Sequence, residues 1–329
     1  MSEIKVRTAT IDDTDEIVEI IKVALGKSDE RSSKKWIWKH FENPFGESQI
    51  LVATDGPKIV GVRAFMTWSW YNKSLNKTYK ALRAVDTAVL PSHRRKGIFS
   101  NLTTLSLEKA KTNGHDFVFN TPNGKSMPGY LKLGWVFNRK IPVNFFINPF
   151  SFFYTQKRLV KLSEEAKQII KKKNLTFTSS LNQFNITTPF TSKFLHWRYI
   201  NNPMINYSYL LLDEKVLLIY YIKERGKTKE CRIADVQILG ENNDVQPKTK
   251  KILKKGIKIL VKRHFFVSIT PNVISDKFLF SFPLLFYKFS LKGPNMTTKQ
   301  ININNDEFSS LHNVSSLDWG YCLGDMELF

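Results

Sequence analysis

The sequence predicts an α/β fold, more exactly α+β with mixed sheets, built from two similar halves. Three observations support this prediction. Short β-branched runs alternate with amphipathic helical patterns, one strand leads into a helix through a basic loop, and several motifs recur in the same order later in the chain. At 329 residues the chain has room for two domains of ordinary size.

Composition narrows the class of protein. A hydrophobic content of 42% and a charged content of 24% are typical of a globular protein. The chain opens on polar residues without a signal-like segment, and its most apolar run, 278–287, is too short to span a bilayer and contains a proline. Two cysteines, Cys231 and Cys322, provide no disulfide framework. We therefore expect a cytoplasmic protein with no transmembrane segment.

The net charge of +21 allows two interpretations. It can indicate an anionic partner, such as a phosphorylated co-substrate or a membrane surface, or it can reflect a lysine-rich genome bias. The lysines are scattered along the sequence and form no single arm, so nucleic acid is not favoured as a partner. The run 171–173 follows an amphipathic pattern and is interpreted as the solvated end of a helix.

The elements of the first half follow from periodicity and from turn residues. An acidic first turn predicts a helix start at 10–13, the Asp-Gly-Pro sequence at 55–57 predicts a hairpin, and alternating apolar residues predict the strands. The expected elements are, in order, a strand at 5–8, a helix reaching 25, strands at 50–54, 59–67 and 81–90, a helix reaching about 111, and a strand at 117–120.

An internal repeat predicts the domain organisation. The motif at 38–44 (Trp-Lys-His-Phe-Glu-Asn-Pro) has a counterpart at 197–203, and the aspartate-containing strand 84–90 resembles 233–239. Thr-Pro-Asn at 121–123 recurs at 270–272, with the same offset as the strands. We therefore predict a first domain over 1–147, a connecting segment over 148–190 and a degenerate second domain over 191–329.

The basic loop after residue 90 predicts an anion site. Such a loop directs backbone N–H groups and a helix N-terminus at one point, where a phosphate is favoured. Arg94, Arg95 and Lys96 add positive charge, and Gly97 permits close approach of the backbone. In the repeat, residues 243–246 take this place with an acid and without glycine, so one anion site per chain is expected. The glycine spacings of dinucleotide and ATP loops are absent.

These residues resemble a known family. Arg94-Arg95-Lys96-Gly97-Ile98-Phe99 is similar to the Arg/Gln-x-x-Gly-x-Gly/Ala signature of the GNAT superfamily of N-acetyltransferases, although Phe99 replaces a small residue. The sequence Pro-x-His-Arg-Arg-x-Gly around this signature resembles that of the tandem-domain, Eis-like branch of the family. The stretch 123–135 resembles the family's later motif, in which a tyrosine precedes Lys-Leu-Gly-aromatic. The resemblance covers 1–147 and implies two tandem GNAT-like domains, each a mixed, mostly antiparallel twisted sheet flanked by helices.

The resemblance also implies the ligands. Acetyl-CoA is expected as co-substrate, and the acceptor is expected to be a primary amine on a small molecule, such as an amino sugar or a nucleotide-linked amino sugar. Asn123 and Ser126 are expected either to bind the pantetheine amides or to cap the following helix. The residues expected to contact acetyl-CoA are Ala88, Val89, Leu90, Arg94, Arg95, Lys96, Gly97, Ile98, Phe99, Asn123 and Ser126.

Candidates for proton transfer are fewer. Tyr130 is expected to protonate the departing thiolate, since a tyrosine pKa of about 10 lies near that of a thiol; the alternative is a packed aromatic. The base is either Asp86 or the terminal carboxylate of Phe329, which Eis-like enzymes are expected to use. Asp235 occupies the position of Asp86 in the repeat, where the basic loop is missing. This favours a structural role for both aspartates. The tail that carries Phe329 is either docked or a last edge strand.

The remaining candidates are weaker. His40, His93 and His115 are expected to be surface or loop residues, and no metal-ligand spacing occurs. Trp68 and Trp70 are expected in the core, with stacking on the acceptor as the alternative. Two other functions stay open: an inactive tandem GNAT-like module that binds an anionic partner, and an aminoacyl transferase of the cell-wall type. The sequence does not indicate the oligomeric state.

Overall fold

The computed structural model describes residues 3–27, 31–154, 157–172, 177–178, 185–226, 228–240, 247–270, 287–313 and 319–326. The elements up to residue 147 are β1 Ile4–Thr8, α1 Thr14–Leu25, α2 Ser33–His40, β2 Gln49–Asp55, β3 Lys58–Asn72, β4 Lys77–Val89, α3 Ile98–Thr112, β5 Phe117–Asn120, α4 Met127–Lys132 and β6 Val136–Ile147. Those that follow are α5 Lys157–Lys172, β7 Phe177–Thr178, β8 Ile186–Thr187, α6 Ser192–Leu195, β9 Ser208–Leu212, β10 Val216–Arg225, β11 Thr228–Leu239, α7 Pro247–Arg263, β12 Phe266–Ile269, β13 Tyr287–Gln300 and α9 Asn305–Asn313.

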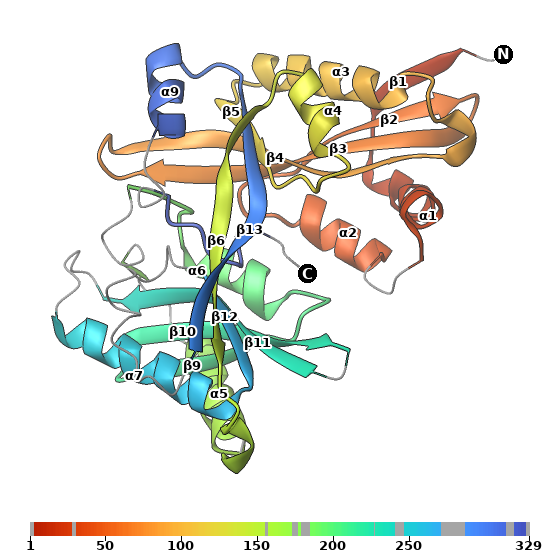
Figure 1. Cartoon of the computed structure of the whole chain (residues 1–329). Coiled ribbons are helices and arrows are strands. Elements are labelled where there is room, and N and C mark those ends of the chain that lie inside the picture. The colour runs from red at the N-terminus through yellow and green to blue at the C-terminus, as the bar shows by residue number, and fades with distance from the viewer. Residues whose placement is uncertain are drawn as a thin grey trace.

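One continuous twisted sheet runs through the molecule in the order β1-β2-β3-β4-β5-β13-β6-β12-β11-β10-β9. Most neighbouring strands are antiparallel, whereas β4 with β5 and β11 with β12 are parallel. In the first half α3 and α4 cover one face of the sheet and α1 and α2 the other (Figure 1). The predicted fold class, mixed sheets flanked by helices, is confirmed.

Two long strands join the halves. β13 lies between β5 and β6, and β6 pairs in turn with β12 through Asn144–Ile147. Figure 1 shows β6 and β13 crossing side by side from the upper to the lower half. The division at residues 147 and 191 stays a prediction. The strand order adds that the segment 191–329 contributes β13 to the sheet of the first half.

The repeat has a clear structural counterpart. Trp38 and Trp197 stack with ring centroids 5.0 Å apart. Each indole Nε1–H donates to the other residue's carbonyl oxygen at 2.8 Å, as expected about a pseudo-twofold axis. Two positions after each tryptophan, a side chain contacts the aspartate of the neighbouring strand. In the first half His40 contacts Asp86, and in the second Tyr199 Oη donates to Asp235 at 2.7 Å.

Several sequence expectations need correction. The hairpin of β3 and β4 extends beyond the predicted strands and turns at 73–76. Trp68 and Trp70 are fully buried in the largest hydrophobic cluster, so core packing is confirmed and stacking on an acceptor is wrong. The tail 319–326 is docked and buried, but it adds no edge strand beyond one bridge, Ile186 to Trp319. Within the described part of the chain, no helix has the length and apolarity to cross a membrane.

Candidate active site

β4 and β5 separate in the middle of the first half's sheet. They pair only at Ala81–Arg83 with Phe117–Phe119. Beyond that point, β4 bulges against β3 between Ala84 and Thr87. The N–H of Leu90 donates to Val60 O at 2.9 Å, so strand alternation directs the N–H of Val89 to the side that β5 has left. The expected cofactor contacts Ala88, Val89 and Leu90 therefore lie on the wall of an opening between strands.

The basic loop has an unusual backbone. Arg95 and Gly97 both adopt positive φ, 62° and 76°, and Gly97 begins α3. Positive φ is costly for residues with a side chain, whereas glycine adopts it readily. Alternating left-handed residues of this kind turn successive N–H groups inward, which forms an anion-binding concavity. Arg95, Lys96 and Gly97 are exposed around it.

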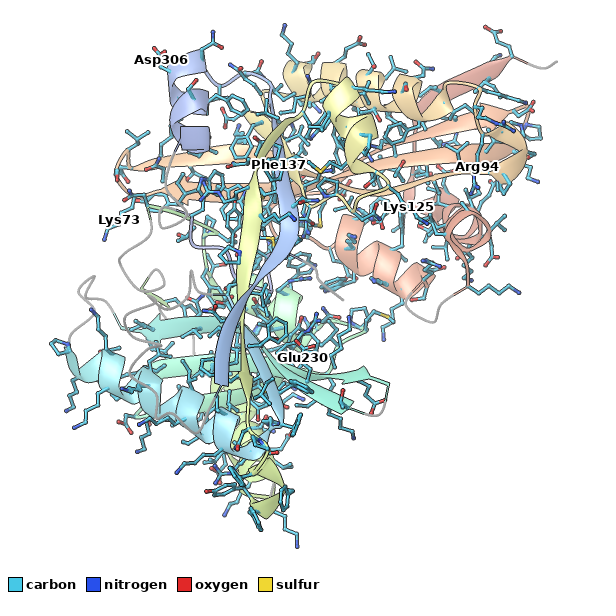
Figure 2. All side chains as sticks on the ribbon, in the orientation of Figure 1. Lys73, Arg94, Lys125, Phe137, Glu230 and Asp306 are labelled. Carbon is cyan, nitrogen blue, oxygen red and sulfur yellow. The ribbon has the colours of Figure 1, made fainter. Side chains whose placement is uncertain are left out.

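Neighbouring side chains brace this loop. Arg94 donates through Nη2 to Ala24 O at the end of α1, 2.9 Å, and through Nε to Val89 O, 3.4 Å. His93 Nε2 lies 3.0 Å from Asp55 in the hairpin turn of β2 and β3. Figure 2 shows Arg94 at the outer side of the first half. Arg94 is thus committed to positioning the loop, and Arg95 and Lys96 stay available to a ligand.

The turn before α4 is organised by Asn123. Its Oδ1 accepts hydrogen bonds from the N–H groups of Lys125 and Ser126, both at 3.0 Å. Ser126 makes no side-chain capping bond and donates instead to Asn123 O, so the expected capping role of Ser126 is wrong. This turn sets the direction in which α4 begins.

Tyr130 of α4 meets a buried arginine. Its hydroxyl accepts a hydrogen bond of 3.0 Å from Nη1 of Arg63, and the Tyr130 side chain is only 4% exposed. Arg63 is fully buried beneath the rings of Phe65, Phe99 and Tyr130, which lie 4.8–5.5 Å from its guanidinium carbon. Nε and Nη2 of Arg63 find no hydrogen-bond partner among the described residues.

Sequence reasoning missed Arg63. It stands in an otherwise apolar strand, Ile59–Phe65, where an arginine is rarely buried without a carboxylate. That contrast was the available signal. Tyr130 is packed between Phe99 and Trp135, with ring centroids 6.2 and 5.2 Å away, as the alternative interpretation expected. Its role as a proton donor stays a prediction.

Asp86 lies on the opposite face, toward α2. Its carboxylate is 2.8 Å from Lys39 Nζ and 3.0 Å from His40 Nε2, and His40 Nδ1 in turn lies 2.8 Å from Ser48 Oγ. His40 is fully buried, so its expected surface position is wrong. Burial raises the pKa of Asp86, but Lys39 and His40 outweigh burial and hold that pKa well below its usual value. A pocket of about 210 Å³ between α1, α2 and β4 includes Asp86 in its wall.

Asp86→Asn is expected to lower the free energy of unfolding at neutral pH by about 1 kcal/mol, since the carboxylate is about a third exposed. The folded-state pKa is depressed, so the contribution is present above the unfolded value of about 3.9 and is lost as pH falls through the lower folded value. Urea unfolding at pH 7 and pH 3 measures this. A stability difference that is as large at pH 3 as at pH 7 would contradict the ion-pair explanation.

The matching opening in the second half is filled. β11 and β12 pair only at Glu230–Arg232 and then separate. The C-terminal segment occupies the gap, because Gly324 N–H donates to Ala234 O at 2.9 Å and Thr270 Oγ1 donates to Tyr321 O at 2.9 Å. β7 pairs with the end of β11. The loop counterpart 243–246 and residues 271–272 lie outside the described part. Filling by the chain itself leaves the first opening as the candidate site.

The same C-terminal segment continues to the first opening. Arg83, at the point where β4 and β5 part, donates through Nη1 to Asp325 O at 2.7 Å and through Nη2 to Met326 O. Asp325 also accepts a hydrogen bond from Thr188 Oγ1 at 2.8 Å. Phe329, the candidate base, lies outside the described residues.

No group of three or more His, Cys, Asp or Glu side chains that could hold a metal ion occurs within the described ranges. Both cysteines are buried and free, and burial raises the pKa of each thiol.

Comparison with known proteins identifies the first half. Residues 5–137 match the family described as acetyltransferase (GNAT) domain. No curated protein matches the chain in sequence at a significant level.

Solved structures resemble the fold of the whole chain. A GCN5-related N-acetyltransferase from Anabaena variabilis is 12% identical, with a TM-score of 0.60 over 91% of this chain and 73% of that one. A probable N-acyltransferase from Enterococcus faecalis is 11% identical, with a TM-score of 0.63 over 92% and 74%. Eis1 from Mycobacterium abscessus is 10% identical, with a TM-score of 0.53 over 89% and 73%. Residues 5–137 are therefore similar to the GNAT acetyltransferase domain, and the fold of the whole chain resembles that of solved GNAT structures.

Proposed function

We propose that this protein is an Eis-like, tandem-domain N-acetyltransferase that uses acetyl-CoA and acylates a primary amine on a small molecule. The proposal rests on one observation: the basic loop and the separated strands β4 and β5 lie next to each other. An anion-binding loop with two free cations lies at the end of the strand whose neighbour has separated. A coenzyme A thioester has a pyrophosphate and an amide-containing arm, which match these two features in order.

The residues of the opening fit this co-substrate. Arg95, Lys96 and the N–H groups of Gly97 and Ile98 would hold the pyrophosphate, as at other helix N-termini. Main-chain groups on the free side of β4 would pair with the amides of the arm. When bound, acetyl-CoA supplies the activated acyl group. The N–H of Val89 would then stabilise negative charge that develops on the carbonyl oxygen.

Tyr130 is the proposed general acid. It would give its hydroxyl proton to the departing sulfur, and the oxygen left behind would stay hydrogen-bonded to the buried guanidinium of Arg63. Arg63 then acts as a positioning residue, because its Nη1–H fixes the hydroxyl and its charge compensates the oxygen that has lost its proton. Among the described residues no carboxylate pairs with Arg63, so its charge is available to the oxygen of Tyr130.

For the base, we favour the terminal carboxylate of Phe329 over Asp86. Asp86 is already ionised and is held by the Lys39 ammonium and the His40 imidazole, and a carboxylate with a depressed pKa accepts a proton poorly. Asp235 has the same strand position, and the sequence that follows it lacks the basic residues of the loop, which supports a shared structural role. The pocket beside Asp86 is also lined by Arg31, Lys35 and Lys39, so its wall carries a net positive charge and does not favour a protonated amine.

Acetyl-CoA is expected to raise the melting temperature by several degrees, because free ligand at about 100 times Kd adds about 2.7 kcal/mol to the native state. Differential scanning fluorimetry and calorimetric titration measure this. The double variant Arg95→Glu, Lys96→Glu is expected to abolish the shift. The control Lys250→Glu, Lys255→Glu makes the same change of charge at exposed sites on α7 in the second half and should keep it.

Two outcomes would contradict the proposal. The first is the absence of any thermal shift at millimolar acetyl-CoA. The second is a shift that survives in the loop variant, which would place binding elsewhere. Binding without turnover on any amine in a broad acceptor screen would favour the inactive binding module.

A further inference from the structure

An aromatic cluster protrudes at the far end of the second half. The aromatic tip (Phe150, Phe152, Phe153 and Tyr154) follows β6, and its two outermost rings are 74% and 72% exposed for Phe152 and Phe153. Phenylalanine is normally buried, so two adjacent rings in water are costly. Their centroids lie 4.2 Å apart, and the pair presents one continuous apolar surface.

The aromatic tip is built rather than frayed. Asn148, which is 1% exposed, donates through Nδ2 to Val261 O and Lys262 O at 3.0 and 3.1 Å. Its Oδ1 accepts the N–H of Phe150 at 3.0 Å, and its own N–H donates to Phe265 O at 2.9 Å. These bonds fasten the tip to the C-terminal end of α7. The backbone at the start of the tip is therefore fixed relative to α7.

α7 is strongly basic on its outer face. The helix contains seven lysines and one arginine and no acidic residue. Its buried face packs on the sheet through Ile252, Leu253, Ile257 and Leu260. Lysines that are scattered in the sequence thus gather on one helix face in the fold. The exposed ones are Lys248, Lys250, Lys251, Lys255 and Lys262.

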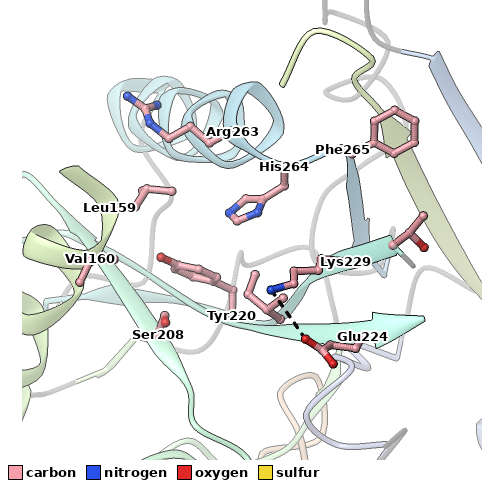
Figure 3. A pocket seen from close by; sticks show the side chains of 11 residues that line it. Leu159, Val160, Ser208, Tyr220, Glu224, Lys229, Arg263, His264 and Phe265 are labelled. Carbon is pink, nitrogen blue, oxygen red and sulfur yellow. Dashed lines mark ion pairs between the residues drawn. The ribbon is translucent and has the colours of Figure 1, made fainter. Parts of the chain in front are cut away.

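A hollow of about 830 Å³ lies between α5, β10 and the end of α7, and its lining is partly apolar and partly charged, with Glu224, Lys229, Arg263 and His264 among its residues. Val160 and Phe265 stand on opposite sides of it, with Tyr220 between them (Figure 3). Its rim includes Val160, Ile222 and Phe265, which are 62%, 40% and 42% exposed. Exposed aliphatic and aromatic side chains therefore surround the end of the lysine helix.

We infer that this end of the molecule docks on an anionic lipid membrane. The aromatic tip would enter the interface, where apolar side chains leave water, and the α7 lysines would face the anionic headgroups. A nucleic acid would also attract the lysines. Nucleobases, however, stack on flat aromatic faces and gain little from contact with Val160 and Ile222, whereas lipid hydrocarbon packs favourably against such aliphatic side chains. Figure 1 places α7 at the end away from α3 and α4, so docking would leave the candidate active site accessible.

The test is sedimentation of the full-length protein with vesicles. Binding is expected to phosphatidylcholine vesicles that contain about a third phosphatidylglycerol, and to be lost without the anionic lipid and at high salt. Lys251→Gln, Lys255→Gln should weaken binding about 25-fold, at about fivefold per lysine. Phe152→Ser, Phe153→Ser should weaken it on the order of tenfold or more. Lys5→Gln, Lys111→Gln is the matched charge control and should bind as the parent does.

Insertion needs a readout of its own. In Phe153→Trp, the new indole emission is expected to shift to shorter wavelength and to be quenched by bromine-labelled lipid chains. Absence of quenching, or unchanged binding by the serine variant, would overturn insertion of the tip. Equal binding to vesicles with and without anionic lipid would overturn the role of α7. Binding to single-stranded RNA but not to vesicles would replace the proposal by a nucleic-acid interface.

Discussion

Tyr130→Phe is expected to lower kcat by about 10²- to 10⁴-fold while acetyl-CoA affinity stays nearly unchanged. The substitution removes one oxygen and keeps the ring, which lies 5.2 Å from Trp135 and 6.2 Å from Phe99 between centroids. The packing of α4 and the anion-binding loop is therefore retained. Only the proton donor is lost, so the departing thiolate must be protonated by water.

Steady-state kinetics with a thiol-detecting reagent gives kcat and KM, and calorimetric titration gives the acetyl-CoA affinity. Tyr71→Phe is the matched control, since its hydroxyl bonds Asn76 in the hairpin of β3 and β4 away from the opening. It should retain full turnover. If Tyr130→Phe turns over as fast as the parent, Tyr130 is a packed aromatic and the acid lies elsewhere.

Individual helices, strands and turns could be predicted because the residues that determine them lie close together in the sequence. The hairpin at 55–57, the strand at 117–120 and the helix that begins after Gly97 depend on turn residues and on short-range periodicity. The exchange of β6 and β13 could not be predicted. It depends on pairing between residues about 150 apart, and alternating apolar residues in a strand do not specify which neighbour it takes.

The site divides in the same way. The place of the loop between a strand and a helix was predicted, since a basic glycine-ended turn is a local sequence signal, whereas its ligand contacts stay a prediction. The roles of the other candidate residues depend on contacts between residues far apart in the sequence. Lys39 and His40 contact Asp86, Arg83 contacts the C-terminal segment, and Arg63 contacts Tyr130. The internal repeat favoured a structural role for Asp86. The hydrogen bond from Tyr199 to Asp235, at the same position of the second half, supports that role.

Arg63 gives the sharpest separation of stability from activity. Stripping a guanidinium of water costs several kcal/mol, and here no carboxylate among the described residues offsets that cost. The aromatic rings around it contribute about 2 kcal/mol when desolvated, and the one bond to Tyr130 contributes about 1 kcal/mol. The balance is unfavourable to folding, as expected for a residue retained for chemistry.

Arg63→Met is therefore expected to raise the free energy of unfolding by about 1 kcal/mol or more and to lower kcat about tenfold or more, because Tyr130 loses both its hydrogen-bond donor and the compensating charge. Urea unfolding and steady-state kinetics on the same preparation test both signs, and Arg63→Lys should restore part of kcat without the gain in stability. A methionine variant that is less stable and also less active would assign Arg63 to the structure. A variant that is more stable and fully active would show that the buried charge does not assist Tyr130. Only a rise in stability together with a fall in kcat, at unchanged acetyl-CoA affinity, fits a cation held beneath the acid for proton transfer.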